Sequence, residues 1–143
     1  MPATPLTQAQ LSAFYKHISL PEKFHNSSPS LDLLTAIQYH SLATIPFENL
    51  SLHYSPTPGV SIDPADVFSK IVDRNVGRGG YCMENNLLMN GVLRAAGFNV
   101  WATGARIIEV KDGEVHYNGW HVLPPFPVPD EIDTNTINTG PTC

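Results

Sequence analysis

Apolar residues recur every three or four positions along the first third of the chain, and this spacing predicts two helices. Thr7 and Gln10 form a capping-box pattern before the first helix. Ser30 is placed to cap the second, which should stop before Pro46. Residues 49–59 then favour extended chain and turn, because they contain two prolines and a glycine. The residues expected to face inward are Leu11, Phe14, Tyr15 and Ile18 in the first helix and Leu33, Leu34, Ile37 and Leu42 in the second.

The pattern predicts two more helices between residues 63 and 96. Asp63 and Pro64 match the N-cap and first position of a third helix. The fourth should run from about Tyr81 to Ala96, with Gly97 in the left-handed conformation that often follows a helix. The inward-facing residues of the third helix would be Val67, Phe68, Ile71 and Val72.

Alternating apolar residues after Phe98 predict strands instead of helices. The sequence KDGE at residues 111–114 is typical of a hairpin turn, and residues 115–123 form the returning strand. Helices followed by strands favour an α+β fold, with residues 1–97 as a helical domain and residues 98–123 as a partial β domain.

Residues 124–143 have a different composition and are predicted to be a disordered tail. Prolines dominate residues 124–129, so this stretch should neither continue a helix nor donate to a sheet. The edge of the predicted β domain would then be uncovered. We therefore interpret the chain as one that stops within a domain.

Composition narrows the range of partners. The net charge is −5 and the eight basic residues are scattered, which argues against nucleic acid and anionic membranes as partners. No apolar run approaches the roughly 20 residues of a membrane span, and the N-terminus lacks the pattern of a secretory signal. Two cysteines make no disulfide framework, so a cytoplasmic location is expected. Composition makes no prediction of the oligomeric state.

Cys82 is the strongest candidate for chemistry. It follows a glycine pair in residues 78–86, RGGYCMENN, and stands at the predicted start of a helix. The positive end of a helix dipole favours a thiolate, the reactive form of cysteine. The alternative is an inert buried cysteine, which is the commoner fate of a free thiol.

His121, in an apolar strand-like run 39 positions later, could serve as the base for this thiol. A histidine with a purely structural role is the alternative, and His116 competes for the same task. The two are five residues apart, so on a regular strand they would point to opposite faces. The six histidines show no ligand spacing, and we expect no metal.

Glu48 and Arg78 could form a pair that braces the loop before Cys82. Glu48 lies in an otherwise apolar stretch and Arg78 is next to the glycine pair. Unrelated surface positions for both are the alternative.

Two stretches of the chain resemble motifs of the arylamine N-acetyltransferase family. Residues 45–50, IPFENL, are similar to its N-terminal signature, and residues 78–86 to its nucleophile motif. Residues 97–100 and 105–107 match the strand entry that follows. The resemblance covers about residues 10–123.

This resemblance implies a helical domain followed by an antiparallel β-barrel, with a site layout similar to that of cysteine proteinases. It implies ping-pong chemistry in which Cys82 takes an acetyl group from acetyl-CoA as a thioester and passes it to an arylamine or arylhydrazine. His121 would be the base, and Phe47 would line the acceptor pocket. The partners would be arylamines and acyl-CoA, without nucleic acid or membrane.

The chain departs from the family in length and in its last catalytic residue. Family members are about twice as long, and their aspartate motif after the histidine is missing. Asp130 and Asp133 lie in the proline-rich tail and are poor replacements. We therefore expect a truncated member. Alternatives are a catalytically dead fragment that acts by binding or dimerising, and a thiol hydrolase similar to papain or transglutaminase.

Overall fold

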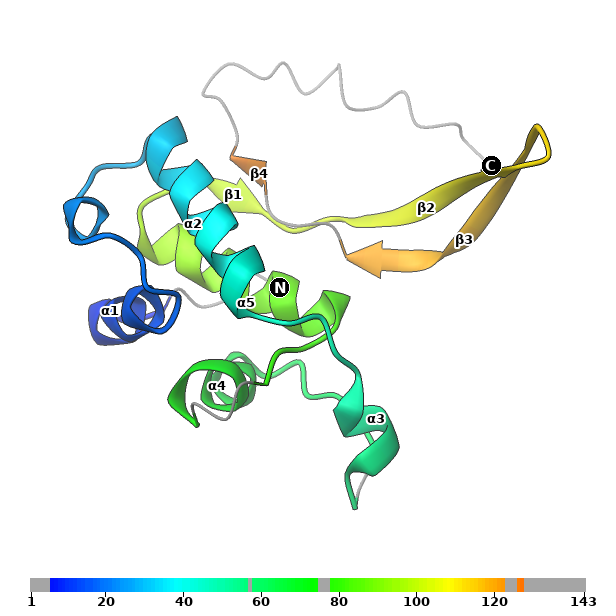
Figure 1. The fold of residues 1–143 in the computed structure, drawn as a ribbon, viewed down its shortest axis with the longest axis horizontal. Coiled ribbons are helices and arrows are strands. Elements are labelled where there is room, and N and C mark those ends of the chain that lie inside the picture. Colours follow the sequence, from blue (N-terminus) through cyan, green and yellow to red (C-terminus); the bar gives the residue numbers. More distant parts are fainter. Residues whose placement is uncertain (1–5, 57, 75–77, 123–125, 128–143) are drawn as a thin grey trace.

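The computed structural model describes residues 6–56, 58–74, 78–122 and 126–127. Most of its helical elements pack together, the short helix at residues 50–54 lies apart from them, and a long two-stranded hairpin projects from the packed helices (Figure 1). The helical elements are α1 (Gln8–His17), η1 (Glu22–Phe24), α2 (Leu31–Thr44), α3 (Leu50–Tyr54), α4 (Pro64–Phe68), the π-helical turn η2 (Ser69–Asp73) and α5 (Cys82–Ala95). The strands are β1 (Val100–Trp101), β2 (Gly104–Lys111), β3 (Glu114–Val122) and β4 (Phe126–Pro127). The predicted mixture of helix and sheet is confirmed.

The predicted helix starts are confirmed by their hydrogen bonds. Thr7 Oγ1 accepts the Gln10 amide at 3.2 Å, and Gln10 Oε1 accepts the Thr7 amide at 2.9 Å. Ser30 Oγ accepts the amide of Leu33 at 3.2 Å. Asp63 Oδ1 accepts the Ala65 amide at 2.8 Å, so each cap satisfies donors that the first turn leaves free.

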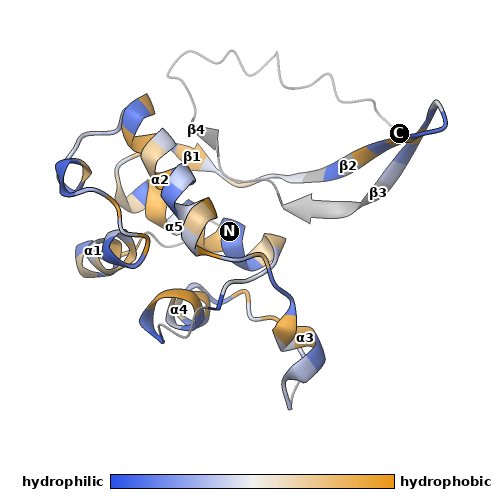
Figure 2. Ribbon diagram, viewed as in Figure 1, coloured by the Kyte–Doolittle hydropathy of each residue, from blue (hydrophilic) through white to orange (hydrophobic). Residues whose placement is uncertain are grey.

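Buried apolar side chains of α1, α2, α4, η2, α5 and β1 form the core. Apolar residues along α2, α5 and β1 are orange in Figure 2. Leu42 does not join the core as predicted, because its side chain is 73% exposed. Leu42 is five residues beyond Ile37, about 140° around the helix, whereas Ser41 lies on the buried face. The largest fully buried side chains are Phe14, Ile18, Leu33, Ile37, Val67, Ile71, Val92 and Leu93.

The segment after α2 forms a short helix where extended chain was predicted. Helix α3 is five residues long and ends before Pro56, so the prolines do not interrupt it. Glu48 Oε2 accepts the Leu50 amide at 2.6 Å and satisfies the first donor of this helix. Helix α3 is thus stabilised by the side chain of Glu48, which lies outside the helix, and residues 50–54 alone do not predict it.

The hairpin has the predicted turn, but its register contains an irregularity. Ile108 pairs with Tyr117 and Arg106 with Trp120, so β3 carries one residue more than β2 over this stretch. The alternation used to place His116 and His121 on opposite faces therefore does not apply. Strand β4 pairs with β1 at residues 126–127, although no sheet pairing was expected of the proline-rich stretch. The rest of the predicted tail lies outside the described residues.

Candidate active site

Two backbone segments touch directly next to Cys82. Phe47 and Gly80 form a parallel bridge, and the Glu48 amide donates to the Gly80 carbonyl at 3.0 Å. A Cβ on Gly79 would lie 1.7 Å from the carbonyl oxygen of Pro46. Only a residue without a side chain permits this approach, which explains why glycine occupies position 79.

The second glycine makes room for Glu84 in the first turn of α5. A Cβ on Gly80 would lie 2.6 Å from the Cβ of Glu84. Glu84 Oε2 accepts the Tyr81 amide at 3.2 Å, which is one half of a capping box. Cys82 is the first residue of α5, as predicted, and its side chain is partly buried.

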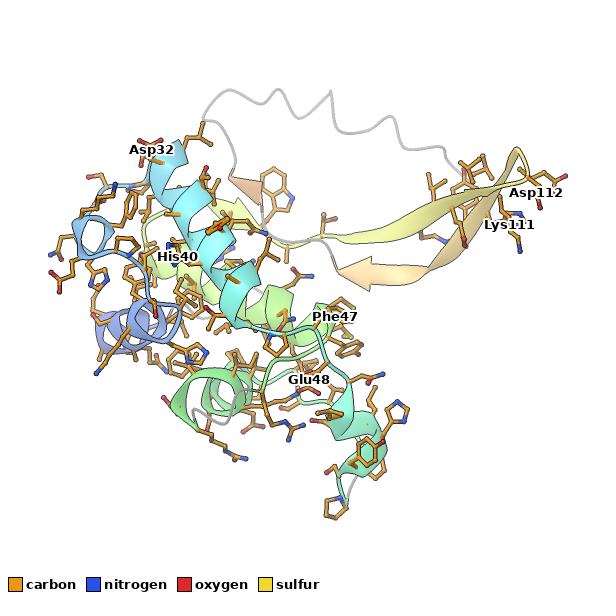
Figure 3. All side chains as sticks on the ribbon, viewed as in Figure 1. Asp32, His40, Phe47, Glu48, Lys111 and Asp112 are labelled. Carbon is orange, nitrogen blue, oxygen red and sulfur yellow. The ribbon has the colours of Figure 1, made fainter. Side chains whose placement is uncertain are left out.

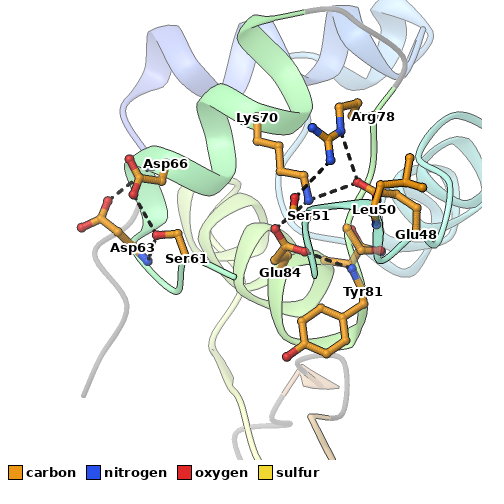
Figure 4. A network of polar contacts seen from close by, with 12 residues as sticks. Glu48, Leu50, Ser51, Ser61, Asp63, Asp66, Lys70, Arg78, Tyr81 and Glu84 are labelled. Atoms are coloured by element: carbon orange, nitrogen blue, oxygen red, sulfur yellow. Dashed lines mark hydrogen bonds and ion pairs between the residues drawn. The ribbon is translucent and has the colours of Figure 1, made fainter. Parts of the chain in front are cut away.

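A cluster of four charged side chains lies behind this turn (Figure 4). The Nζ atom of Lys70 is 3.1 Å from Glu48 Oε1 and 2.8 Å from Glu84 Oε1. Arg78 Nε is 3.6 Å from Glu48 Oε1, the distance of an ion pair rather than a hydrogen bond. Glu48 and Arg78 therefore do come together, as the sequence suggested.

The carboxyl group of Glu48 is held in its charged form. Burial raises its pKa, but the Leu50 amide, Lys70 and Arg78 lower it by more, so the net pKa is below the ordinary value. The side chain of Glu48 is 11% exposed, that of Lys70 15% and that of Glu84 3%. Opposite charges with this little solvent interact more strongly than surface pairs.

Phe47 lies on the connection between α2 and α3, next to Glu48 (Figure 3). Its ring is 73% exposed, although its backbone is fixed to Gly80 by the parallel bridge. Phe47 is therefore not part of the apolar core, and its contact with a substrate stays a prediction.

His121 lies on β3, where its backbone pairs with Ala105. Strand β3 contacts α5, the helix that begins at Cys82. The side chain of His121 is outside the described part of the chain, as are Asp130, Asp133 and Cys143. His116 is described and is exposed opposite Glu109.

Two members of the charged cluster, Lys70 and Glu84, were not predicted from the sequence. A signal for Glu84 was present, because it stands three residues after the helix-capping position, where an acidic residue often closes a capping box. Lys70 offered no comparable signal. Its role depends on a contact between η2 and α5 across 14 residues of sequence.

A polar cavity of about 660 Å³ lies beside the charged cluster. It is lined by residues of α3, the connection at residues 58–61, α4, η2 and α5, including Lys70 and Glu84, but Cys82 is not among its lining residues. We therefore assign it no part in binding a substrate at the thiol. The described residues contain no group of three His, Cys, Asp or Glu side chains that could hold a metal ion. Within the same ranges, no helix has the length and apolarity needed to cross a membrane.

Comparison with known proteins identifies relatives over most of the chain. A family model described as N-acetyltransferase matches residues 30–131. An N-malonyltransferase of Fusarium pseudograminearum is 36% identical over 159 residues, covering 94% of this chain and 46% of that relative. A pineal gland arylamine N-acetyltransferase of Gallus gallus is 43% identical over 79 residues, covering 55% of this chain and 26% of that protein.

Solved structures agree with these sequences. The arylamine N-acetyltransferase of Nocardia farcinica superposes with a TM-score of 0.65 at 29% identity, over 85% of this chain and 40% of that chain. This chain thus spans about half the length of the curated relatives that match it over most of its own length. The family model covers most of the chain and the structural match is of the same kind, so the chain belongs to the arylamine N-acetyltransferase family.

Proposed function

We propose that this chain carries the nucleophile of an acyl-CoA-dependent arylamine N-acyltransferase. The observation that carries the proposal is the position of Cys82 at the first residue of α5, next to a glycine pair that is locked against residues 46–48. A partly buried thiol at a helix start, on a rigid backbone, meets the geometric needs of a nucleophile.

The first half-reaction transfers the acyl group to the protein. The Cys82 thiolate attacks the thioester carbonyl of acetyl-CoA, the bond from carbon to the sulfur of coenzyme A breaks, and that sulfur leaves as a thiolate and takes up a proton. Free amides in the first turn of α5 would stabilise the oxyanion of the tetrahedral intermediate. One thioester replaces another, so the step needs no external energy source.

The second half-reaction transfers the acyl group to an amine. An arylamine or arylhydrazine nitrogen attacks the Cys82 thioester, the carbon–sulfur bond breaks, and the amine loses a proton. We assign His121 as the base that takes this proton, on the grounds of its place on β3, the strand that contacts α5. Phe47 would line the acceptor site, and Glu48 and Arg78 would support the loop.

The same proposal extends to the fold and the setting of the enzyme. Strands β1 to β3 would begin an antiparallel barrel, and helix followed by sheet would bring Cys82 and His121 together in a layout similar to cysteine proteinases. Two cysteines and a net charge of −5 fit an enzyme of the reducing cytoplasm.

Malonyl-CoA is a second candidate for the acyl donor. A relative that covers 94% of this chain is named as an N-malonyltransferase, which favours malonyl-CoA as an alternative to acetyl-CoA. Both donors present the same thioester to Cys82, so the chemistry at sulfur would be unchanged.

Intact-protein mass spectrometry tests the proposal directly. Purified full-length chain is mixed with acetyl-CoA or malonyl-CoA, beside Cys82→Ser and Cys143→Ser variants. One acyl adduct in the wild type and in Cys143→Ser, but not in Cys82→Ser, is the expected result. A folded protein that forms no adduct with either donor would contradict the proposal and favour a chain that acts through binding.

A further inference from the structure

We propose that Lys70 is a positioning residue for Cys82, acting through the two carboxylates that it holds. Neither the family motifs nor the predicted site includes this lysine. The inference rests on the proposed thiol chemistry at Cys82, and it adds the residue that fixes the geometry of that thiol.

The first path runs through Glu84. Lys70 Nζ contacts Glu84 Oε1 at 2.8 Å, while the other oxygen of Glu84 accepts the Tyr81 amide at 3.2 Å. Tyr81 is the residue directly before Cys82 and the N-cap of α5. One carboxylate thus connects the lysine in η2 to the backbone that carries the thiol.

The second path runs through Glu48. The same Nζ atom is 3.1 Å from Glu48 Oε1, and Glu48 Oε2 accepts the Leu50 amide at 2.6 Å. The backbone amide of Glu48 donates to Gly80, two residues before Cys82. Lys70 therefore fixes both segments that meet beside the thiol (Figure 4).

The two carboxylates do not depend on Lys70 equally. Glu48 has Arg78 as a second cation at 3.6 Å, whereas the salt bridge to Glu84 in the described residues comes from Lys70. Glu84 is also the more deeply buried of the two, at 3% exposure. A buried carboxylate that loses its cation is strongly unfavourable, so we expect it to turn towards water. Turning would break its bond to the Tyr81 amide and release the first turn of α5.

The rate of alkylation of Cys82 by iodoacetamide measures this effect without any acyl-CoA. We would work in a Cys143→Ser background, so that Cys82 is the reacting thiol, at a temperature where circular dichroism shows each variant folded. Lys70→Met should react about tenfold more slowly, because a released first turn of α5 no longer holds the helix-end amides that activate the thiol. Lys70→Arg, which can still pair with Glu84, should retain most of the rate. Lys16→Met, which removes an exposed lysine of α1, is the matched control and should react like the parent.

A second change separates positioning from general stability. Glu84→Gln introduces a side chain that carries no charge but can still accept the Tyr81 amide, so the double variant Lys70→Met/Glu84→Gln should recover most of the lost rate. A role in stability alone predicts equal rates in all folded variants. A folded Lys70→Met that reacts at the parental rate, or a folded double variant that stays tenfold slower, would overturn the proposal. If Lys70→Met does not fold, the double variant decides: a folded one within about threefold of the parent supports it.

This test is independent of the proposed enzyme activity. A parent protein that alkylates normally but takes no acyl group from acetyl-CoA or malonyl-CoA would contradict the acyltransferase, while the alkylation rates of the variants would still decide the role of Lys70.

Discussion

The residues packed next to Cys82 are buried, whereas apolar side chains on the β2–β3 hairpin are exposed to solvent. Gly79 and Gly80 are buried, and Glu84 behind them is 3% exposed. On the hairpin, Ile108 is 57% exposed and its partner Tyr117 is 54% exposed. Next to them, Val110 and Val115 form a second cross-strand pair that is also exposed.

The two regions carry the two proposed catalytic residues, Cys82 and His121, and they differ in the contacts that hold each residue in place. The position of Cys82 is set by hydrogen bonds and ion pairs from three nearby segments, 46–48, η2 and the first turn of α5. The hairpin that carries His121 has cross-strand hydrogen bonds, but its described apolar side chains are exposed, and a two-stranded sheet on its own is only marginally stable. The proposed nucleophile is therefore held more firmly than its proposed base.

Gly79→Ala should have the largest effect of the changes in the buried region around Cys82. The added Cβ would meet the Pro46 carbonyl at 1.7 Å, so the two segments beside Cys82 must separate. We expect a loss of about 3 kcal/mol or more in the free energy of unfolding, measured by urea denaturation. Alkylation of Cys82 should change with it.

Gly113→Ala on the hairpin is the matched control. Nothing lies within 4 Å of its added Cβ, and the cost comes from a backbone φ of +82°. That cost is about 1 kcal/mol, and Cys82 alkylation should not change. Equal damage at Cys82 from both variants would contradict the distinction between the two regions.

A pair of valine truncations sharpens the comparison of apolar contacts. Val92 in α5 is 0% exposed and Val110 in β2 is 68% exposed. We expect Val92→Ala to lower the free energy of unfolding by about 2 kcal/mol and Val110→Ala by about 0.5 kcal/mol or less. Chemical denaturation measures both. Similar losses would show that the hairpin face is buried in solution.

The same contrast explains which features the sequence revealed. Helix starts are local, so Ser30 and Asp63 could be identified as caps from their neighbours. Cys82 was proposed as the nucleophile on local signals, a glycine pair at residues 79–80 and a helix start. Leu42 was misplaced because an apolar residue one position off the stripe looks like a core residue until the helix phase is known.

Features that depend on distant contacts could not be predicted. Glu48, which accepts the Leu50 amide at the start of α3, is itself paired with Lys70 from a distant part of the sequence. Lys70 also reaches Glu84 by a contact across 14 residues. The extra residue in β3 depends on its pairing with β2 and has no marker in β3 itself. Pairings between segments are tertiary events, which local propensity does not encode.

Glu48→Gln tests how much the ion pairs of Glu48 stabilise the buried region around Cys82. Because the folded-state pKa of Glu48 lies below its ordinary value of 4.5, its carboxylate stabilises the fold above pH 4.5. That stabilisation is lost as the pH falls through the lowered pKa. We expect the variant to lose about 1.5 kcal/mol at neutral pH and to show a weaker fall in melting temperature between about pH 6 and about pH 3. Glu22→Gln, at an exposed carboxylate, is the control and should keep the parental pH dependence.

Arg78→Lys should have the smallest effect, because Arg78 is the most exposed member of the charged cluster next to Cys82. The side chain of Arg78 is 37% exposed, lies 3.6 Å from Glu48 and donates from Nη2 to Ser51 Oγ at 3.1 Å. Lysine keeps the charge but loses the planar donor group, so we expect a loss below about 1 kcal/mol by urea denaturation. The matched Lys70→Met change removes the more buried cation and should cost more. If Arg78→Lys were the more damaging of the two, the cluster would be centred on Arg78, and Glu48 rather than Glu84 would be the carboxylate that controls the turn before Cys82.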